Sequence, residues 1–376
     1  MGMVGKGKGL REIGYVDCAG GGQVVIKNNI AYIGNMAAPD GTAIFDVSDP
    51  KHPKELSRLG MLPGTHSHKV RVDNDLMIIN RERNPYQIGA PDEFKGGLGI
   101  YDVSNPAKPK LITNWETDGM GVHRFDFDGR YAYISPTVKG YLGNIMMILD
   151  LADPTRPVEV GRWWMPGQWT AGGETPTWEG SDHKCHHPLR LGNRLYTSYW
   201  FGGFVILDVE DMSKPKFVSG YDVSPPFPWP THTALRIPFK IQNRDILLVA
   251  DEDVAQKYPF SPSFLWIFDI TDETRPVPFA SYQVEGVDGS PTPPMTGCHQ
   301  PCEIVTGTEI PVSWFAHGLR ILDIKNPHAP KEVAWYLPEV KPGFGKQVQS
   351  NDVTVDSRGL IYLLDRIRGC WILERE

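Results

Sequence analysis

Short runs of apolar residues that end in an aspartate recur along the chain. In one of them, three apolar residues at 147–149 precede Asp150, and a turn at Asp153-Pro154 leads into a second short strand. The corresponding aspartates are Asp46, Asp102, Asp150, Asp208, Asp269 and Asp323. Their spacing of roughly 50 residues is typical of a propeller, a solenoid or another array of repeats.

Each repeat is predicted to hold four short antiparallel strands. β-Branched and aromatic residues before each aspartate favour a pleated strand, and the Asp-Pro or Asn-Pro pairs that follow several of them favour a tight turn. Ahead of the aspartate run lie two more apolar segments, for example 124–127 and 131–134, which residues 128–130 join as a hairpin. No helix of useful length fits between the repeats, so the predicted fold class is all-β.

The apolar strings carry a family resemblance. Residues 148–151 read Ile-Leu-Asp-Leu, residues 205–209 read Val-Ile-Leu-Asp-Val, and residues 320–324 read Arg-Ile-Leu-Asp-Ile. With their proline-containing turns these strings resemble the LVIVD-repeat β-propeller proteins, and the resemblance spans nearly the whole chain. It implies a propeller of four-stranded blades, and it leaves substrate and reaction open.

The two ends of the chain are predicted to share one blade. Residues 11–16 match an outermost strand with no blade before it, and residues 351–374 supply three strands with no fourth after them. Pairing these ends gives a seven-bladed β-propeller of four-stranded antiparallel blades, a ring that the N-terminal strand closes and that has no exposed sheet edges. A six-bladed ring with an appendage is the alternative. Residues 1–376 are then a single domain with a loose segment at 1–8.

The long connections are predicted to gather on one face of the propeller. They lie within 81–97, 165–182, 224–230, 252–263, 285–297 and 338–346. Tryptophans are frequent in or beside them, namely Trp163, Trp164, Trp169, Trp178 and Trp229. Such an uneven distribution is typical of a binding face. Insertions that are merely tolerated are the alternative explanation.

A histidine recurs at the entrance of the innermost strand. His68, His123 and His187 each precede the first apolar residue of that strand by two positions and that of the next strand by eight, and His232 and His299 hold the corresponding place in the following repeats. Equivalent positions approach the propeller axis on one face, so these imidazoles are expected to converge. Because imidazole binds zinc, copper, iron and manganese, the predicted metal ligands are His68, His123, His187, His232 and His299.

Two propeller families offer an architectural resemblance. Carotenoid-cleaving oxygenases hold iron with four histidines on a seven-bladed propeller axis, and the methanethiol-oxidase or selenium-binding propellers have metal-binding histidines. No sequence motif from either family occurs in this chain. LVIVD-type repeats often begin the inner strand with a histidine, so duplication of one ancestral histidine is the alternative explanation for the register.

Further polar residues lie near the same entrance. The neighbours of the register positions are His66, Asp182, His183, Cys185 and His186, of which Cys185 is a secondary ligand candidate. The charged residues at the ends of the second strands are Arg81, Glu82, Arg83, Asp251, Glu252, Asp253, Asp365 and Arg366. Acids there can orient imidazoles or act as a general base, and arginines can bind a carboxylate or phenolate. The predicted catalytic residues are Glu82, His183, Asp251 and Arg366, and a solvated rim of ion pairs is the alternative.

Composition and charge narrow the range of partners. A net charge of -7 and a pI near 5.9 argue against nucleic acid or an anionic membrane as partner. The start of the chain shows neither a secretory signal nor a membrane span. Five cysteines are an odd and sparse set that favours a reducing cytoplasm, and the spacing within 298–302 is not that of a zinc ribbon or a thioredoxin.

These features predict a cytoplasmic enzyme with one divalent transition metal, iron or copper being favoured over zinc or manganese. The expected partner is a small-molecule substrate, aromatic or otherwise apolar, because the long loops supply Trp, Tyr and Phe. Iron or copper would favour oxidation or oxygenation, and zinc or manganese would favour hydrolysis or a lyase step. The alternative from another class is a non-catalytic scaffold that holds a protein partner through exposed tryptophans.

Overall fold

The computed structural model describes residues 5–84, 87–178, 182–224, 226–253, 263–285, 297–339 and 347–376. The chain divides into two compact units. Unit 1 comprises Met1–Ala31, Phe45–Lys54 and Val223–Glu376, and unit 2 comprises Tyr32–Ile44 and Glu55–Asp222. Apart from the short 3-10 helix Thr170–Gly172, the regular elements of the described residues are β-strands.

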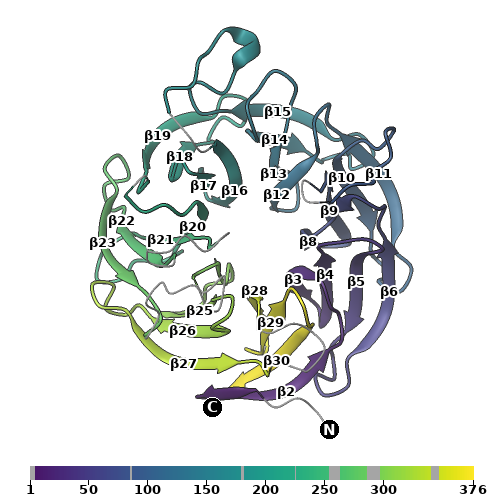
Figure 1. Ribbon diagram of the computed structural model, residues 1–376, viewed down its shortest axis with the longest axis vertical. Helices are drawn as coiled ribbons and strands as arrows, with labels where there is room; N and C mark the ends of the chain where they lie inside the picture. Colours follow the sequence, from purple (N-terminus) through teal and green to yellow (C-terminus); the bar gives the residue numbers. More distant parts are fainter. Residues whose placement is uncertain are drawn as a thin grey trace. The chain divides into compact units, whose positions relative to one another are not determined.

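Unit 2 contains three antiparallel sheets, which lie side by side in Figure 1 and whose inner strands β8, β12 and β16 are neighbours. The first sheet holds β7 (Thr65–His66), β8 (Val70–Asp73), β9 (Leu76–Arg83), β10 (Gly97–Asp102) and β11 (Lys110–Glu116). The second holds β12 (Val122–Phe127), β13 (Tyr131–Pro136), β14 (Met146–Asp150) and β15 (Val158–Trp163). The third holds β16 (His183–Leu191), β17 (Arg194–Trp200), β18 (Phe204–Asp208) and β19 (Lys216–Tyr221).

Unit 1 contains three further antiparallel sheets. The first holds β20 (Thr231–Arg236), β21 (Ile246–Asp251), β22 (Leu265–Asp269) and β23 (Val277–Tyr282). The second holds β24 (Gln300–Pro301), β25 (Glu309–Ser313), β26 (Leu319–Asp323), β27 (Lys331–Leu337) and β1 (Lys6–Lys8). The third holds β28 (Ser350–Val355), β29 (Ile361–Asp365), β30 (Cys370–Arg375) and β2 (Leu10–Val16). Strand β3 (Gly21–Lys27) also belongs to unit 1, and residues of β4 (Ile30–Asn35), β5 (Asp40–Asp46) and β6 (Lys54–Gly60) are divided between the units.

Strand β14 explains why the third strand of each repeat is an unbroken apolar run. Met147 and Leu149 pack in a core cluster with residues of β12 and β13. Met146 and Ile148 point to the opposite face and pack with residues of β17 and β18. Since successive side chains of a strand alternate between faces, a strand covered on both faces must be apolar at every position.

The repeat aspartates end these strands for the reason that the sequence suggested. Asp150 Oδ1 accepts the backbone N–H of Ala152 at 2.8 Å. The other five make the same bond at 2.8–2.9 Å. A side chain that hydrogen-bonds its own backbone two residues on fixes a turn, so each aspartate directs the chain into the fourth strand.

The N-terminal segment is more ordered than the sequence indicated. Residues 1–8 were expected to be loose, but Lys6–Lys8 form β1 on the edge of β27, where their backbone groups find ladder partners. Residues 1–4 lie outside the described part of the chain. Strand β2 pairs antiparallel with the C-terminal strand β30, which is the pairing predicted for it.

Much of the predicted loop-rich face falls outside the described residues. This holds for 254–262, 286–296 and 340–346, which include most of three expected long connections. In the part of the chain that is described, no helix is long and apolar enough to cross a membrane.

Candidate metal centre

Unit 2 brings three imidazoles to one end of its inner strands. His66 ends β7, His68 lies between β7 and β8, and His123 is the second residue of β12. The long strand β9 places Glu82 opposite His66 in the ladder, and a β-bridge pairs Glu82 with Gly121 just before β12. Backbone pairing therefore holds the Glu82 carboxylate between two histidine-bearing segments.

One carboxylate oxygen of Glu82 contacts two of these rings. Its Oε2 lies 2.6 Å from His66 Nε2 and 2.9 Å from His123 Nδ1. Both rings donate an N–H to this oxygen, so each keeps its other ring nitrogen as a free acceptor. Burial opposes the charge on Glu82, but the imidazoles of His123 and His66 more than offset it and hold the pKa of the carboxyl well below its ordinary value. Glu82 is therefore an ionised group that orients two histidines.

His68 is held differently. Its Nδ1 lies 3.3 Å from Asn80 Nδ2, and the Asn80 amide is fixed because it accepts the Lys69 N–H at 2.8 Å and donates to the Val122 carbonyl at 3.0 Å. Since an amide N–H donates, Nδ1 is the acceptor and Nε2 carries the proton of the neutral ring. Burial, with a contribution from neighbouring positive groups, lowers the pKa of His68 well below its usual value. His68 is therefore neutral, as a metal ligand must be. A metal ion that binds Nε2 would displace the proton on that nitrogen, and the contact between Nδ1 and Asn80 would then change.

The three rings fit a transition-metal ion. One ring nitrogen from each of His66, His68 and His123 lies within 4.8 Å of the others. Ring centroids are 4.2 Å apart for His66 and His68, and 4.9 Å apart for His68 and His123. Metal–nitrogen bonds of about 2.1 Å in a tetrahedral site place ligand nitrogens about 3.4 Å apart, so the rings would shift inward to close around an ion. A carboxylate that bonds the second nitrogen of a histidine is the usual support for such ligands.

The fourth histidine near this group is His186 rather than the predicted His187. The His186 ring lies 5.0 Å from the His123 ring and 4.7 Å from the Trp200 ring, centroid to centroid. His187 is fully buried, and burial lowers its pKa well below the usual value, with Arg124 and Arg71 adding to the effect. It is not one of the three rings that lie within ligand distance of one another.

Two other candidates from this segment lie in different surroundings. Cys185 packs in the core cluster with Tyr133 and Met146, and burial raises the pKa of its thiol well above the usual value. The thiol is therefore protonated while no metal is bound, and a ligand role would require it to lose this proton. His183, a predicted catalytic residue, stacks on the Trp178 ring at 4.5 Å between centroids, and its Nδ1 lies 3.2 Å from the Met165 sulfur.

Unit 1 holds a second group of buried imidazoles. Glu252, directly after β21, has Oε1 at 3.4 Å from His299 Nε2 and at 3.3 Å from Arg366 Nη2. Its Oε2 lies 4.0 Å from His232 Nε2, and the rings of His232 and His299 are 4.2 Å apart between centroids. The His299 Nδ1 donates to the Asn351 carbonyl. The predicted ligands His232 and His299 and the predicted catalytic Arg366 thus converge on one carboxylate, which is Glu252.

Asp251, predicted as a catalytic acid or base, makes contacts within its sheet. It accepts the Thr231 hydroxyl at 3.0 Å and the Trp266 indole N–H at 2.6 Å. These bonds link β20, β21 and β22, and they hold neighbouring strands together.

Glu252 holds the same place in its repeat as Glu82. Ile78 and Leu248 each pair with the isoleucine two positions before the repeat aspartate. Glu82 follows Ile78 by four residues, and Glu252 follows Leu248 by four. The repeat therefore presents a glutamate to two imidazoles in each unit. Glu82 precedes its repeat aspartate by 20 residues and Glu252 precedes its own by 17, so the ladder register, and not a count along the sequence, reveals that they are equivalent.

The buried neutral histidines predict a loss of stability in mild acid. Because the pKa of His68 and of His187 is lowered in the folded protein, the unfolded chain takes up protons as the pH falls below about 6.5 and the folded protein does not. Each histidine should remove about 1.4 kcal/mol of stability at one pH unit below that value. Urea unfolding of the metal-free protein at pH 7.5 and 5.5 measures this loss. His187→Gln should make it smaller, and an unchanged difference in that variant would contradict the assignment.

The repeats are found independently by comparison with known families. A family model described as LVIVD repeat matches residues 21–59, 93–117, 127–164 and 191–223. No match is found among curated proteins.

Solved structures resemble the chain over nearly its whole length. A chain of a mitotic checkpoint complex structure has a TM-score of 0.59 at 9% identity, with 96% of this chain and 90% of that chain covered. A chain in a structure of an S. cerevisiae Dbp5 variant bound to Nup159, a Gle1 variant, IP6 and ADP has a TM-score of 0.57 at 10% identity, with 99% and 95% covered. The computationally designed Ika8 protein has a TM-score of 0.54 at 6% identity, with 96% and 98% covered. At such identities the likeness concerns the fold alone.

Proposed function

Because the chain is an LVIVD-repeat protein with the four-stranded sheets of a β-propeller, we propose that it is a metal-dependent enzyme whose ion is held by His66, His68 and His123. The observation that carries the proposal is the approach of three ring nitrogens to within 4.8 Å beside an ionised glutamate. Glu82 positions His66 and His123 and leaves one nitrogen of each ring available. His232 and His299 belong to the separate group around Glu252, and the proposal requires no ligand from it.

The donor set favours a divalent transition metal. Iron or copper bound there would supply redox chemistry for oxidation or oxygenation of a small aromatic or apolar molecule, and zinc or manganese would instead supply a Lewis acid for a hydrolase or lyase. The chain's own contribution is to lower the pKa of His68 and of His123 through burial, which favours their neutral form, and to fix the orientation of His66 and His123 through Glu82. An oxidoreductase is the leading assignment, with the hydrolase or lyase second.

Elemental analysis of the purified, untagged protein tests the proposal. About one iron or copper ion per chain is expected in the wild type, and His123→Ala should lose it, because that ring provides a nitrogen oriented by Glu82. His52→Ala is the matched control, since His52 is exposed and its Nδ1 pairs with Asp49 at 2.8 Å. A wild-type protein that holds no metal, even after incubation with each of the four ions, would rule the proposal out. Equal loss of metal in both variants would do the same.

A second candidate function is a scaffold for a protein partner. Tyr141, Trp164 and Trp169 form an aromatic group in which Trp169 is 40% exposed. Glu174 fixes the loop because it accepts the Trp164 indole N–H at 3.1 Å and the Gly167 N–H at 2.8 Å. Exposed aromatic residues on a rigid support are typical hot spots of interfaces. Trp169→Ala should weaken partner binding if the scaffold function holds, and should leave metal content and turnover unchanged if the enzyme function holds.

We also propose that the sheets form a seven-bladed ring in a reducing, cytoplasmic compartment. The six repeat aspartates and the pairing of β2 with β30 support the blade count. The five cysteines support the compartment, since all are buried and none forms a disulfide. A net charge of -7 makes a small molecule a better partner than nucleic acid or an anionic membrane.

A further inference from the structure

A small cavity in unit 2 adjoins the proposed metal centre. Its volume is about 200 Å³, and it lies on the face of β9 that bears Ile79 and Arg81. Asn80 and Glu82 alternate with these residues and belong to the opposite face. His66 lines the cavity and also bonds Glu82, so the cavity and the imidazole group share one side chain.

Three residues that line this cavity each carry a buried polar atom that lacks a hydrogen-bond partner within the described ranges. The atoms are Thr42 Oγ1, Ser67 Oγ and Arg81 Nη1, and each atom is buried. Thr42 is 0% exposed and Ser67 is 6% exposed as whole residues. A buried donor without a partner is destabilising, and more so when it is charged. Three such residues around one cavity offer polar groups to a ligand.

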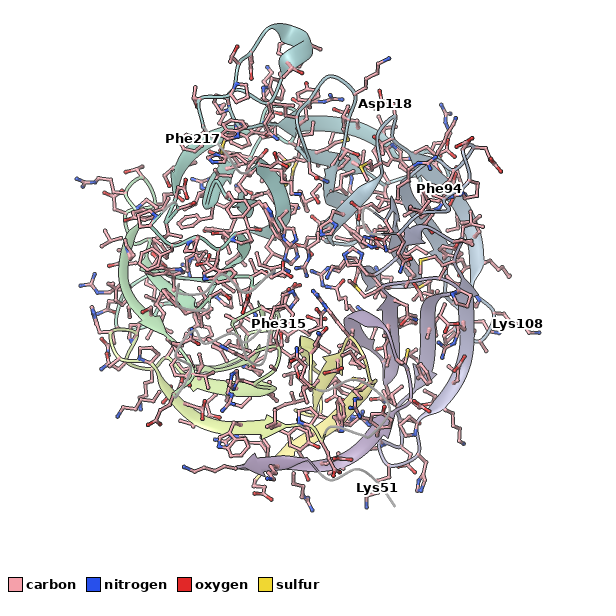
Figure 2. The ribbon with its side chains drawn as sticks, viewed as in Figure 1. Lys51, Phe94, Lys108, Asp118, Phe217 and Phe315 are labelled. Atoms are coloured by element: carbon pink, nitrogen blue, oxygen red, sulfur yellow. The ribbon has the colours of Figure 1, made fainter. Side chains whose placement is uncertain are left out.

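Arg81 gives the cavity its charge. Burial lowers the pKa of its guanidinium, yet a guanidinium remains charged at neutral pH. Its guanidinium carbon lies 5.3 Å from the centroid of the Phe94 ring, which is labelled in Figure 2. Arg83, two residues on, differs in that its Nη2 donates to the carbonyls of Pro91, Asp92 and Phe94. Arg83 thus holds the segment that carries Phe94, whereas Arg81 lines the cavity beside Tyr101 and is attracted by the Glu116 carboxylate.

The remaining walls define the rest of the ligand. Leu59, Met61, Ile79, Phe94 and Leu111 contribute apolar surface. About seven water molecules occupy a volume of about 200 Å³ in the liquid, so only a small molecule fits in the cavity. One charged donor and two hydroxyls among apolar walls match a compact apolar body that ends in an anion.

We propose that this cavity binds the carboxylate of a small apolar or aromatic acid, with Arg81 as its anchor and Thr42 and Ser67 as hydrogen-bond donors. Arginine favours carboxylates because its planar fork presents two parallel N–H groups. The inference rests on the proposed function in one respect, namely that the bound acid is the substrate of the adjoining metal centre. The substrate class of that centre is then a small carboxylic acid.

Calorimetric titration of the chelator-treated, full-length protein with benzoate and with neutral benzamide tests the inference. Benzoate should bind at least roughly tenfold more tightly than benzamide, because only benzoate forms the charge-assisted pair with Arg81. Arg81→Met should remove this preference, since it keeps the apolar stem and loses the charge. Arg58→Met is the matched control because it removes the same charge from a residue that pairs with Glu55 at 2.8 Å outside the cavity lining.

A second variant keeps the test decisive if Arg81→Met does not fold. Thr42→Val preserves shape and removes a hydroxyl without a partner, so it should raise the urea midpoint of unfolding and weaken benzoate binding several-fold. Equal binding of benzoate and benzamide would overturn the inference. Tighter binding of inorganic phosphate than of benzoate would overturn the choice of a carboxylate.

These experiments can reject the proposed metal centre and the proposed acid-binding cavity independently of each other. The titrations use metal-free protein, so benzoate binding in a chain that takes up no metal would reject the proposed function and retain the acid-binding cavity. Metal uptake without preferential benzoate binding would reject the inference and retain the metal centre.

Discussion

Glu82→Gln is expected to lower the affinity of the protein for its metal by roughly ten- to a hundredfold while the protein remains folded. The carboxylate holds His66 and His123 through one oxygen at 2.6 and 2.9 Å. Its negatively charged oxygen accepts an N–H from each ring and so fixes which nitrogen of each carries the proton. Glutamine has nearly the same volume and keeps a carbonyl acceptor, but it lacks the charge.

Competition with a chelator of known affinity measures this loss for each variant. Glu116→Gln serves as the control because Glu116 is an exposed residue at the end of β11 in the same unit. Thermal unfolding of the metal-free proteins separates positioning from folding, since Glu82→Gln should change metal affinity far more than the unfolding temperature. Wild-type metal affinity in Glu82→Gln would show that Glu82 does not position the ligands.

The fold was predictable because its signals are local. Each repeat aspartate bonds the backbone two residues on, and each preceding apolar run is a strand covered on both faces. Neither feature depends on distant parts of the chain, so a single sequence reveals both. The β2–β30 pairing followed from counting strands at the two ends of the chain.

The site was predictable only in part because the inner strands are irregular where the histidines lie. His68 and His123 were identified from a fixed offset to the next strand, and both belong to the imidazole group. The ladder register shifts between His183 and His187, so alternation cannot be counted through this segment. That irregularity explains why His186, and not His187, contacts His123.

The role of His66 could not be predicted from a periodic pattern, because it depends on the pairing of two strands. His66 lies two residues before His68, and it enters the group because the short strand β7 pairs with the extended end of β9. The cavity beside it was likewise hidden, because Thr42 and Arg81 belong to different sheets. Only the folding of the chain brings such residues together.

Deletion of residues 1–16 is expected to unfold the protein or cause it to aggregate. The deletion removes β2, whose Leu10 and Val16 are 5% and 1% exposed, and the Tyr15 ring that packs 5.3 Å from the ring of Trp371. Burial of a leucine and a valine alone contributes roughly 3–6 kcal/mol, which is comparable with the total stability of many domains. The loss also leaves the apolar strand β30 as an open edge, and such edges pair with other chains.

Thermal unfolding and size-exclusion chromatography measure this effect, and deletion of residues 1–5 is the control because it leaves both β1 and β2 intact. A synthetic peptide that spans residues 8–17 should restore the elution volume of the full-length protein when it is added to the truncated protein, since an extended peptide can complete a sheet edge. A peptide of the same composition in scrambled order should not restore it, because Leu10 and Val16 would no longer occupy the buried positions opposite Arg375 and Cys370. Wild-type stability in the protein that lacks residues 1–16 would contradict a role for β2 in holding the C-terminal sheet together.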